Sequence, residues 1–397
     1  MKIGILTWYI GYNVGAALQA KALQYKVQEL FPEHNCETIF YQTEEQDEMY
    51  TLRKRLRNAI NRKSLRSTLV NLYMIPILHK KKNAIDSFIE QYMKISKKKY
   101  IGSKEIVCSN EEYDAFICGS DQIWNPYWLD STYLLDFVRK GKRKISYAAS
   151  IGVNKIDEDK GTIFLKNLCT YDAISVREKT GKVALETVYI DEKLGEPSIE
   201  VVCDPTLLLS KKEWNEALSI REDAKPKDDY VICYFLGNEP VYMDVVKKYA
   251  TKQNKKIYYI KYANGFRKTD IFMGGRNYKI YEQINPRDFV EIITNAEVVF
   301  TDSFHGMCFS LIEETPFYLF DRNLAIGKSS INMSSRTDEL LNSLNLTNRK
   351  INETTSNAIL EEINKSENIQ WIQVKEKLDM YYRKPSVNWL YNTLKSF

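Results

Sequence analysis

The stretch TDSFHG, residues 301–306, places a histidine and several polar residues between two apolar runs. His305 is one of only three histidines in the chain. Imidazole titrates near neutral pH, so this side chain could shuttle a proton. Val298–Thr301 have the composition of a buried strand, and Met307–Ser310 that of a packed helix. Because Asp302–Gly306 would form the turn at the strand end, we favour a catalytic His305 over a hydrogen-bonded core histidine.

Four further polar clusters follow short apolar runs that are typical of strands. These clusters are NVGAALQ at 13–19, GSDQIWNP at 119–126, REKTG at 177–181 and DPTLLL at 204–209. In an open parallel sheet, ligands bind beyond the carboxyl ends of the strands, where loops and helix N-termini converge. The five clusters therefore predict a binding site at such an edge.

The residue types in these clusters suit an anionic ligand. Glycine and serine in GSDQ and SFHG can present backbone N–H groups at a helix start, where the helix dipole favours phosphate or carboxylate. Arg177 can hold either group through two parallel N–H···O bonds. Alternatives stay open: the glycines can serve backbone geometry alone, Arg177 can pair locally with Glu178, and Asp204 can be a helix cap.

The elements that carry these clusters alternate between strand-like and helix-like segments, the pattern of a mostly parallel α/β fold. We predict strands at 2–7, 115–118, 145–149, 173–176 and 200–203, and a second series at 230–236, 256–260, 297–301 and 317–320. The charged, proline-containing segment SIREDAKPKDDY at 219–230 is the best linker candidate. This predicts two Rossmann-like domains, 1–220 and 221–375, with the site in the cleft between them. For residues 376–397 we predict an amphipathic helix that packs on the second domain or crosses back to the first.

Charge is unevenly distributed along the chain of 397 residues, whose net charge is +5. Residues 51–100 hold 14 Lys and Arg against two acids, so this helix-like segment is +12 and the remainder is −7. The segment can be a solvated helical face, or it can bind an anionic lipid head group or a lipid-linked diphosphate. Nucleic acid is disfavoured, because aromatic interleaving and the known motifs are missing.

Several protein classes are excluded by motifs that the sequence lacks. Nothing at the N-terminus resembles a signal peptide, so we expect none, and no apolar run approaches the roughly 20 residues of a membrane span. The seven cysteines are scattered in apolar runs, which predicts reduced thiols and a cytoplasmic protein. His34 and His79 stand in unrelated contexts without HExxH or CxxC spacing, so we expect no metal. P-loop, GxGxxG and GxSxG motifs are also missing, which disfavours the corresponding nucleotide-binding and hydrolase classes.

The sequence resembles the polysaccharide pyruvyl transferase family in seven segments and in their order and spacing. These segments are NVGAALQAKALQ, YDAFICGSDQIWNP, KISYAASIG, YDAISVRE, CDPTLLL, TDSFHG and SSRTDELL. Val14 and Lys21 stand where that family usually has aromatic residues. The resemblance implies a two-domain GT-B-type fold and transfer of pyruvate from phosphoenolpyruvate onto two sugar hydroxyls, forming a cyclic ketal. It also implies an acceptor side in the first domain and a donor side in the second.

The family's motifs also imply roles for residues of this sequence. His305 matches the histidine of the SFHG motif and is our expected general acid/base, with Asp121 as a second catalytic group or a loop cap. The expected donor-binding residues are Arg177, Ser303, Phe304, Gly306 and, as a secondary candidate, Arg336. The expected acceptor-binding residues are Asn13, Gly15, Ser120, Gln122 and Trp124, the last by stacking on a sugar unless it lies in the core.

This interpretation implies phosphoenolpyruvate as co-substrate, no separate cofactor, and a saccharide acceptor that can be lipid-linked. The chain would then serve cell-surface or exopolysaccharide biosynthesis from the cytoplasm, or from the inner face of a membrane that it contacts peripherally. Two rival functions stay open at this point. One is a GT-B glycosyltransferase that uses a nucleotide sugar, and the other is a saccharide-binding protein that keeps the fold without the reaction.

Overall fold

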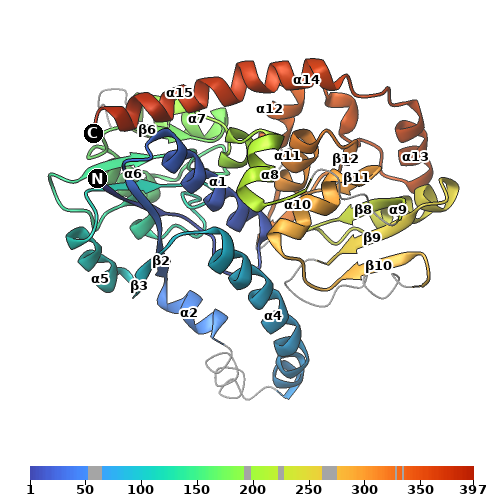
Figure 1. Ribbon diagram of the computed structural model, residues 1–397, viewed down its shortest axis with the longest axis horizontal. Helices are drawn as coiled ribbons and strands as arrows, with labels where there is room; N and C mark the ends of the chain where they lie inside the picture. The colour runs from blue at the N-terminus through green and yellow to red at the C-terminus, as the bar shows by residue number, and fades with distance from the viewer. Residues whose placement is uncertain (52–64, 192–197, 222–227, 262–274, 327–328, 333–334) are drawn as a thin grey trace. The chain divides into compact units, whose positions relative to one another are not determined.

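A computed structural model describes residues 1–51, 65–191, 198–221, 228–261, 275–326, 329–332 and 335–397 of the chain (Figure 1). It divides into two compact units. Unit 1 comprises Met1–His79, Asp86–Leu209 and Tyr382–Phe397, and unit 2 comprises Lys80–Ile85 and Ser210–Tyr381. Each unit contains its own five-stranded parallel sheet.

The sheet of unit 1 has the strand order β3-β2-β1-β4-β5, and every neighbouring pair is parallel. Its strands are β1 (Lys2–Leu6), β2 (Asn35–Gln42), β3 (Ile95–Ile101), β4 (Ala115–Cys118) and β5 (Arg143–Ser146). All four residues of β4 are buried, as expected for a central parallel strand covered on both faces. A short parallel pair, β6 (Ile174–Val176) and β7 (Ile199–Val201), is joined to the β5 region by single bridges.

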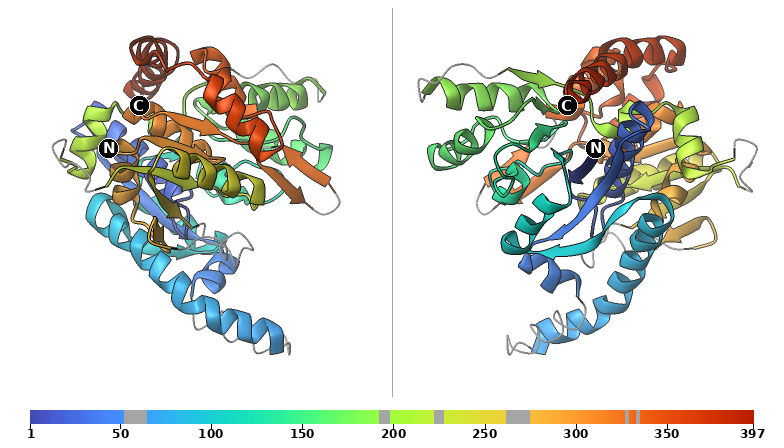
Figure 2. Two further views of the ribbon diagram at one scale, coloured as in Figure 1. Left: turned by 90° about the vertical axis from the view of Figure 1, so that its right-hand side faces the viewer. Right: turned by 60° about the vertical axis from the view of Figure 1, so that its left-hand side comes forward.

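Unit 1 contains the helices α1 (Val14–Leu30), α2 (Glu44–Tyr50), α4 (Leu65–Tyr92, which passes through the short Lys80–Ile85 part of unit 2), α5 (Ser103–Ile106), α6 (Glu158–Leu168), α7 (Lys179–Asp191) and the 3-10 turns η1 (Val107–Glu111), η2 (Ser131–Leu134) and η3 (Pro205–Leu208). Among the helices of unit 1, α1 and α2 begin at side-chain caps. Thr43 and Gln46 form a capping box at the start of α2. Figure 2 shows α2 and the first part of α4 extending away from the sheet of unit 1.

The last helix, α15 (Lys384–Lys395), belongs to unit 1, although unit 2 precedes it in the chain. The Ser386 hydroxyl accepts a hydrogen bond from the backbone N–H of Cys203 at 2.9 Å. Arg383 donates to the carbonyls of Leu207 and Leu209 at 3.0 and 3.3 Å. These contacts fasten the C-terminus to the segment that follows β7.

Unit 2 repeats the same topology, with the parallel order β10-β9-β8-β11-β12. Its strands are β8 (Tyr230–Tyr234), β9 (Lys256–Ile260), β10 (Tyr278–Tyr281), β11 (Val298–Thr301) and β12 (Phe317–Leu319), followed by the antiparallel hairpin β13 (Asn323–Ile326) and β14 (Ser329–Asn332). Its helices are α8 (Lys211–Leu218), α9 (Pro240–Lys252), α10 (Pro286–Thr294), α11 (Phe304–Glu313), α12 (Ser335–Leu344), α13 (Ser356–Lys365) and α14 (Trp371–Leu378), with the 3-10 turn η5 (Thr347–Arg349) and the π-helical stretch η6 (Asp379–Arg383) that leads back to unit 1.

The predicted α/β class with two Rossmann-like sheets is confirmed, and each of the nine predicted strands overlaps an observed one. Strands β2, β3, β10 and the hairpin were not predicted. β3 escaped prediction because it lies in the basic segment and exposes Lys97, Lys98 and Lys99. The expected boundary after residue 220 also differs from the observed division at Leu209–Ser210. The reason is that α8 packs on α11, with the Trp214 and Phe309 rings 5.0 Å apart.

The structure bears only in part on the predictions about the basic segment, the linker, the cysteines and membrane spans. Residues 52–64 of the basic segment and 222–227 of the expected linker lie outside the described residues. All seven cysteines are free, and five of them are buried. Within the described ranges, no helix is long and apolar enough to span a membrane.

Candidate functional site

The turn that carries His305 is built by hydrogen bonds around the end of β11. The Thr301 hydroxyl donates to the carbonyl of Tyr234 at 2.7 Å and accepts from the N–H of Ser303 at 3.0 Å. The Ser303 hydroxyl caps α11 by accepting from the N–H of Gly306 at 3.3 Å. A Cβ at Gly306 would lie 2.7 Å from the Thr301 hydroxyl oxygen, so the helix start requires glycine. His305 lies in this first turn and is 8% exposed.

Asp302 ties the end of β8 to the end of β11. Its two carboxylate oxygens accept from the backbone N–H groups of Leu236 and Gly237, each at 2.6 Å. A Cβ at Gly237 would lie 2.8 Å from an Asp302 oxygen and 3.6 Å from the Cγ of Arg322. Asp302 is therefore already engaged in holding the loop, and Arg322 lies beside it.

Arg322 was not identified from the sequence, although it follows β12 by the same strand-end rule that selected His305. Its Nε atom is buried and has no hydrogen-bond partner among the described residues. Arg336, in the first turn of α12, places its guanidinium 5.4 Å from the centre of the Phe304 ring. Unit 2 thus brings together the predicted residues Ser303, Phe304, His305, Gly306 and Arg336, and adds Arg322.

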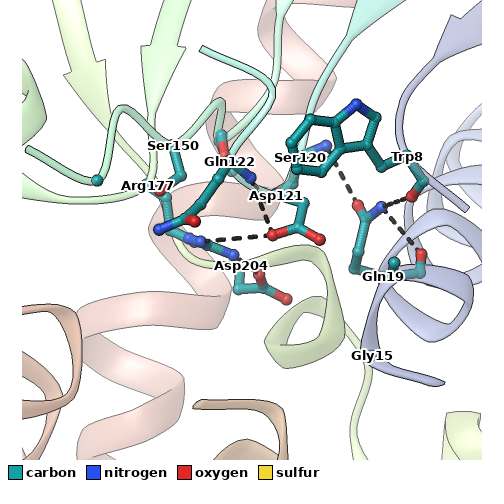
Figure 3. A network of polar contacts seen from close by, with 12 residues as sticks. Trp8, Gly15, Gln19, Ser120, Asp121, Gln122, Ser150, Arg177 and Asp204 are labelled. Atoms are coloured by element: carbon teal, nitrogen blue, oxygen red, sulfur yellow. Dashed lines mark hydrogen bonds and ion pairs between the residues drawn. The ribbon is translucent and has the colours of Figure 1, made fainter. Parts of the chain in front are cut away.

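In unit 1, Gln19 connects three segments at the ends of β1 and β4. Its amide nitrogen lies 2.9 Å from the Thr7 hydroxyl, 2.8 Å from the Trp8 carbonyl and 3.0 Å from the Ala16 carbonyl. Its amide oxygen accepts from the N–H of Ser120 at 3.2 Å. Figure 3 shows this bridge between α1 and the loop after β4. The sequence placed Gln19 in a cluster without showing that it would be the connecting residue.

Asp121 is held by the same loop in an unusual backbone conformation. Its φ of +67° lies in the left-handed region, which costs a non-glycine residue about 1 kcal/mol or more. Its carbonyl accepts from the N–H of Ser150 at 2.9 Å, and its carboxylate accepts from the N–H of Gln122 at 2.9 Å. Such conformations often occur at functional sites, which agrees with the choice of Asp121 as a candidate.

Arg177 lies near three carboxylates, and Figure 3 labels two of them, Asp121 and Asp204. Its nitrogens are 2.7 Å from Asp204, 3.8 Å from Glu178 and 4.0 Å from Asp121. Burial alone would lower the pKa of Arg177, but the carboxylates of Asp204, Glu178 and Asp121 outweigh it and raise the pKa above its ordinary value. The expected donor-binding role of Arg177 is therefore corrected: its side chain is 2% exposed and interacts with carboxylates of its own chain.

Glu178 and Asp204 hold the loops around Arg177. One carboxylate oxygen of Glu178 accepts from the N–H groups of Ile151 and Gly152 at 2.8 and 2.9 Å, and from the Ser150 hydroxyl at 3.1 Å. Asp204 also caps η3, as its helix-cap interpretation predicted, by accepting from the N–H of Thr206 at 2.9 Å. The cluster joins the ends of β4, β6 and β7. The local pair of Arg177 with Glu178 that the sequence left open is observed at 3.8 Å. No local pattern indicated the bonds of Glu178 to the Ile151 and Gly152 N–H groups.

Of the five expected acceptor-binding residues, Trp124 needs correction, whereas Asn13 and Gly15 have a structural role at the start of α1. Trp124 is fully buried, donates its indole N–H to the carbonyl of Tyr133 at 2.9 Å and packs edge-on against Phe164. It is a core residue and has no face for a sugar. Asn13 caps α1, and its side chain accepts from the N–H groups of Gly15 and Ala16, so the Gly15 N–H is already engaged.

The other two acceptor candidates, Ser120 and Gln122, lie next to Asp121. The Ser120 hydroxyl donates to the carbonyl of Ala148 at 2.8 Å. The amide nitrogen of Gln122 is buried without a hydrogen-bond partner among the described residues. Within the described part of the chain, no three or more His, Cys, Asp or Glu side chains are grouped so that they could hold a metal ion.

Solved structures with the same fold include UDP-GlcNAc 2-epimerases and a protein in complex with UDP. A putative UDP-N-acetylglucosamine 2-epimerase from Listeria monocytogenes is 14% identical, with a TM-score of 0.55 over 100% of this chain and 96% of its own. The UDP-GlcNAc 2-epimerase from Neisseria meningitidis bound to UDP-GlcNAc is 10% identical, with a TM-score of 0.55 over 100% of both chains. Anabaena Alr3699/HepE in complex with UDP is 10% identical, with a TM-score of 0.52 over 100% of both chains. At these identities the likeness shows the fold, which is the expected GT-B type.

Comparison of the sequence with family models identifies the family. A family model described as polysaccharide pyruvyl transferase matches residues 13–323, from the cap of α1 to the segment after β12. No curated protein gives a significant match.

Proposed function

Because the chain belongs to the polysaccharide pyruvyl transferase family, we propose that it transfers pyruvate from phosphoenolpyruvate to two hydroxyls of a saccharide and forms a cyclic ketal. The family match over residues 13–323 supports the transferase class. The single structural observation that carries the proposal is the His305 turn. The largely buried imidazole of His305 lies in the first turn of α11, and the ring of the preceding residue, Phe304, contacts the guanidinium of Arg336.

The donor would bind in unit 2. Phosphoenolpyruvate carries a phosphate and a carboxylate, which require cations and N–H donors. The start of α11 supplies a favourable dipole end, and Arg336 and Arg322 supply guanidinium groups near it. This assignment replaces Arg177, whose charge is balanced by Asp204 and its neighbours.

The reaction needs one proton added to the donor and two removed from the acceptor. His305 gives a proton to the methylene carbon of the enol, and a sugar hydroxyl adds to the adjacent carbon. The bond from that carbon to the phosphate oxygen breaks, phosphate leaves, and the second hydroxyl adds in its place. Asp121 accepts one hydroxyl proton and the other leaves with phosphate. The proton on Asp121 returns through solvent to His305, which restores both groups, and Arg177 orients Asp121 from 4.0 Å.

The acceptor and its cellular location follow from the same proposal. A saccharide for a cell-surface or exopolysaccharide polymer, carried on a lipid diphosphate, fits the exposed cations of the basic segment, among them Lys97, Lys98 and Lys99 on β3. The protein would then act in the cytoplasm, at the inner face of the membrane. No separate cofactor or metal enters the proposed reaction.

The direct test is incubation of the purified protein with phosphoenolpyruvate and a panel of free and lipid-linked saccharides. We expect phosphate release that depends on the acceptor, together with a pyruvyl ketal in the mass spectrum of the product. Release of phosphate without an acceptor, or no ketal with any saccharide of the panel, would contradict the proposal.

A nucleotide-sugar glycosyltransferase is the second candidate, because two structures of the same fold are bound to UDP or UDP-GlcNAc. Thermal unfolding separates the two functions. The pyruvyl transferase proposal expects phosphoenolpyruvate to raise the melting temperature, with no effect of UDP or ADP. Stabilisation by a nucleoside diphosphate alone would favour the glycosyltransferase.

A further inference from the structure

Two neighbouring aromatic side chains on the loop after β4 are exposed. Tyr127 is 57% exposed and Trp128 is 38% exposed. The preceding part of this loop is buried, including Asp121, Gln122 and Trp124. Two neighbouring rings exposed to water on an otherwise buried loop form an apolar patch, and such patches mark binding sites for ligands or partners.

The Trp128 ring and the backbone of Tyr127 are held in place by the loop itself. The indole N–H of Trp128 donates to the carbonyl of Gln122 at 3.1 Å, and its backbone N–H donates to the carbonyl of Asn125 at 3.2 Å. The backbone N–H of Tyr127 donates to the side chain of Asn125 at 3.0 Å, and Asn125 is 1% exposed. A ligand that contacts the Trp128 ring therefore orders little that is not already ordered.

The residues of this loop include acids and no cations, which disfavours an anionic partner. Residues 119–138 contain Asp121, Asp130 and Asp136 and no Lys or Arg. An anionic lipid surface would be repelled by such a segment, whereas a neutral ligand rich in hydroxyl groups would not. The same loop holds the Gln122 amide nitrogen, a buried donor with no hydrogen-bond partner among the described residues.

We propose that Tyr127 and Trp128 form a stacking surface for a pyranose ring of the acceptor saccharide. The C–H bonds of one sugar face would lie on the aromatic rings, and the sugar hydroxyls would lie toward the Gln122 and Asp121 end of the loop. Trp128 is well placed for this role, because its indole nitrogen contacts the carbonyl of the residue next to Asp121. This inference rests on the proposed function for the identity of the saccharide as an acceptor, and it moves the stacking role from Trp124 to Trp128.

The test compares Trp128→Ala, Trp128→Phe and Tyr127→Ala with wild type. Tyr381→Ala is the matched control, because Tyr381 is also 57% exposed but lies in unit 2, in η6. Saccharide binding is measured without phosphoenolpyruvate, by saturation-transfer NMR with disaccharides of gluco, galacto and manno configuration at millimolar concentration. The KM for the best acceptor and the KM for phosphoenolpyruvate are measured separately.

We expect Trp128→Ala to weaken saccharide binding and to raise the acceptor KM about fivefold to tenfold, the size of one aromatic contact. The KM for phosphoenolpyruvate should stay unchanged, Trp128→Phe should retain most of the binding, and the Tyr381→Ala control should match wild type. Equal saccharide binding by wild type and Trp128→Ala would overturn the inference, as would no detectable binding by wild type.

Two further outcomes are distinguishable. If Trp128→Ala instead lowers co-sedimentation with vesicles of phosphatidylethanolamine and phosphatidylglycerol, with saccharide binding unchanged, the rings contact a membrane and the inference is wrong. If saccharides bind through Trp128 but no pyruvyl ketal forms, the stacking surface stands and the proposed function fails.

Discussion

His305 and Arg177 came from the same type of motif, but their surroundings differ. His305 lies in the first turn of α11, whereas Arg177 is enclosed by three carboxylates. His305 therefore fits a role in proton transfer, and Arg177 fits a role in positioning Asp121. Substitutions should separate the two roles.

Replacing His305 by alanine should lower the rate of ketal formation by about 100-fold or more, because general acid catalysis contributes that much. The measurement is phosphate release from phosphoenolpyruvate with a saturating acceptor. His79→Ala is the control, since His79 lies on α4, far in sequence from the His305 turn, and is exposed. Unchanged turnover in His305→Ala would show that another group moves the proton.

Replacing Arg177 by methionine should lower the free energy of unfolding by about 3 to 5 kcal/mol, because it leaves buried carboxylates without their cation. Urea unfolding at pH 7 measures the loss. Arg143→Met provides the comparison: Arg143 pairs with Asp172 on the surface, and such a pair is worth about 0 to 1 kcal/mol. Equal losses in the two variants would contradict the structural role of Arg177.

The contact between α8, α10 and α11 contains a buried acid that makes stability depend on pH. Burial raises the pKa of Glu313 above its ordinary value, although Lys211 at 3.4 Å and the Thr294 hydroxyl at 2.9 Å oppose this shift. In the unfolded chain the group loses its proton at a lower pH than in the fold. The contribution of Glu313 to the free energy of unfolding should therefore fall as pH rises from about 4.5 through the raised pKa.

Glu313→Gln should remove this part of the pH dependence. The difference in unfolding free energy between the variant and wild type should move in favour of the variant as pH rises from 4 to 7. Denaturant titrations at several pH values test this, with Glu314→Gln, the neighbouring and more exposed acid, as control. A difference that stays constant with pH would refute the expected titration.

Strand ends were the most informative pattern in the sequence. The rule that ligands bind beyond the carboxyl ends of parallel strands selected Asp121 and His305. The same rule could have selected Arg322, which follows β12. It could not show that Arg177 faces Asp204, because their contact joins residues 27 positions apart at the ends of β6 and β7.

Side-chain burial in the loop after β4 could not be predicted from sequence. Trp124 and Trp128 are four positions apart in one irregular segment, which has neither the helical nor the strand period. The structure buries Trp124 and exposes Trp128 because the loop folds back on itself, with the Asn125 and Trp128 N–H groups bonded to the carbonyls of Gln122 and Asn125. Tertiary contacts of this kind decide which aromatic ring meets the solvent.

For the whole molecule, the alternation of strand-like and helix-like segments predicted the two parallel sheets. It did not decide whether residues 376–397 pack on the first domain or on the second. Tyr382–Phe397 belong to unit 1 through hydrogen bonds to the segment after β7. Sequence alternation shows that a helix exists and does not show which sheet it covers. The division at Ser210 was missed for the same reason, since the packing of Trp214 lies outside any local pattern.

Removing Tyr382–Phe397 should destabilise unit 1 and leave unit 2 nearly unchanged. The lost contacts include the Ser386 bond to Cys203 and the Arg383 bonds to Leu207 and Leu209. Hydrogen–deuterium exchange should become faster in η3 and in α1, which contacts η3, and not in α9. Faster exchange confined to unit 2 would show that the last helix stabilises the other unit.

The placement of the last helix also has a consequence for synthesis on the ribosome. Unit 1 is made of the first part of the chain and its final segment, so its N-terminal sheet leaves the ribosome well before the helix that completes it. At ordinary elongation rates the delay is on the order of 10 s. During that time the surface formed by Leu207, Leu209 and Cys203 lacks its cover. Nascent chains stalled before residue 382 should therefore bind chaperones, and the full-length chain should release them.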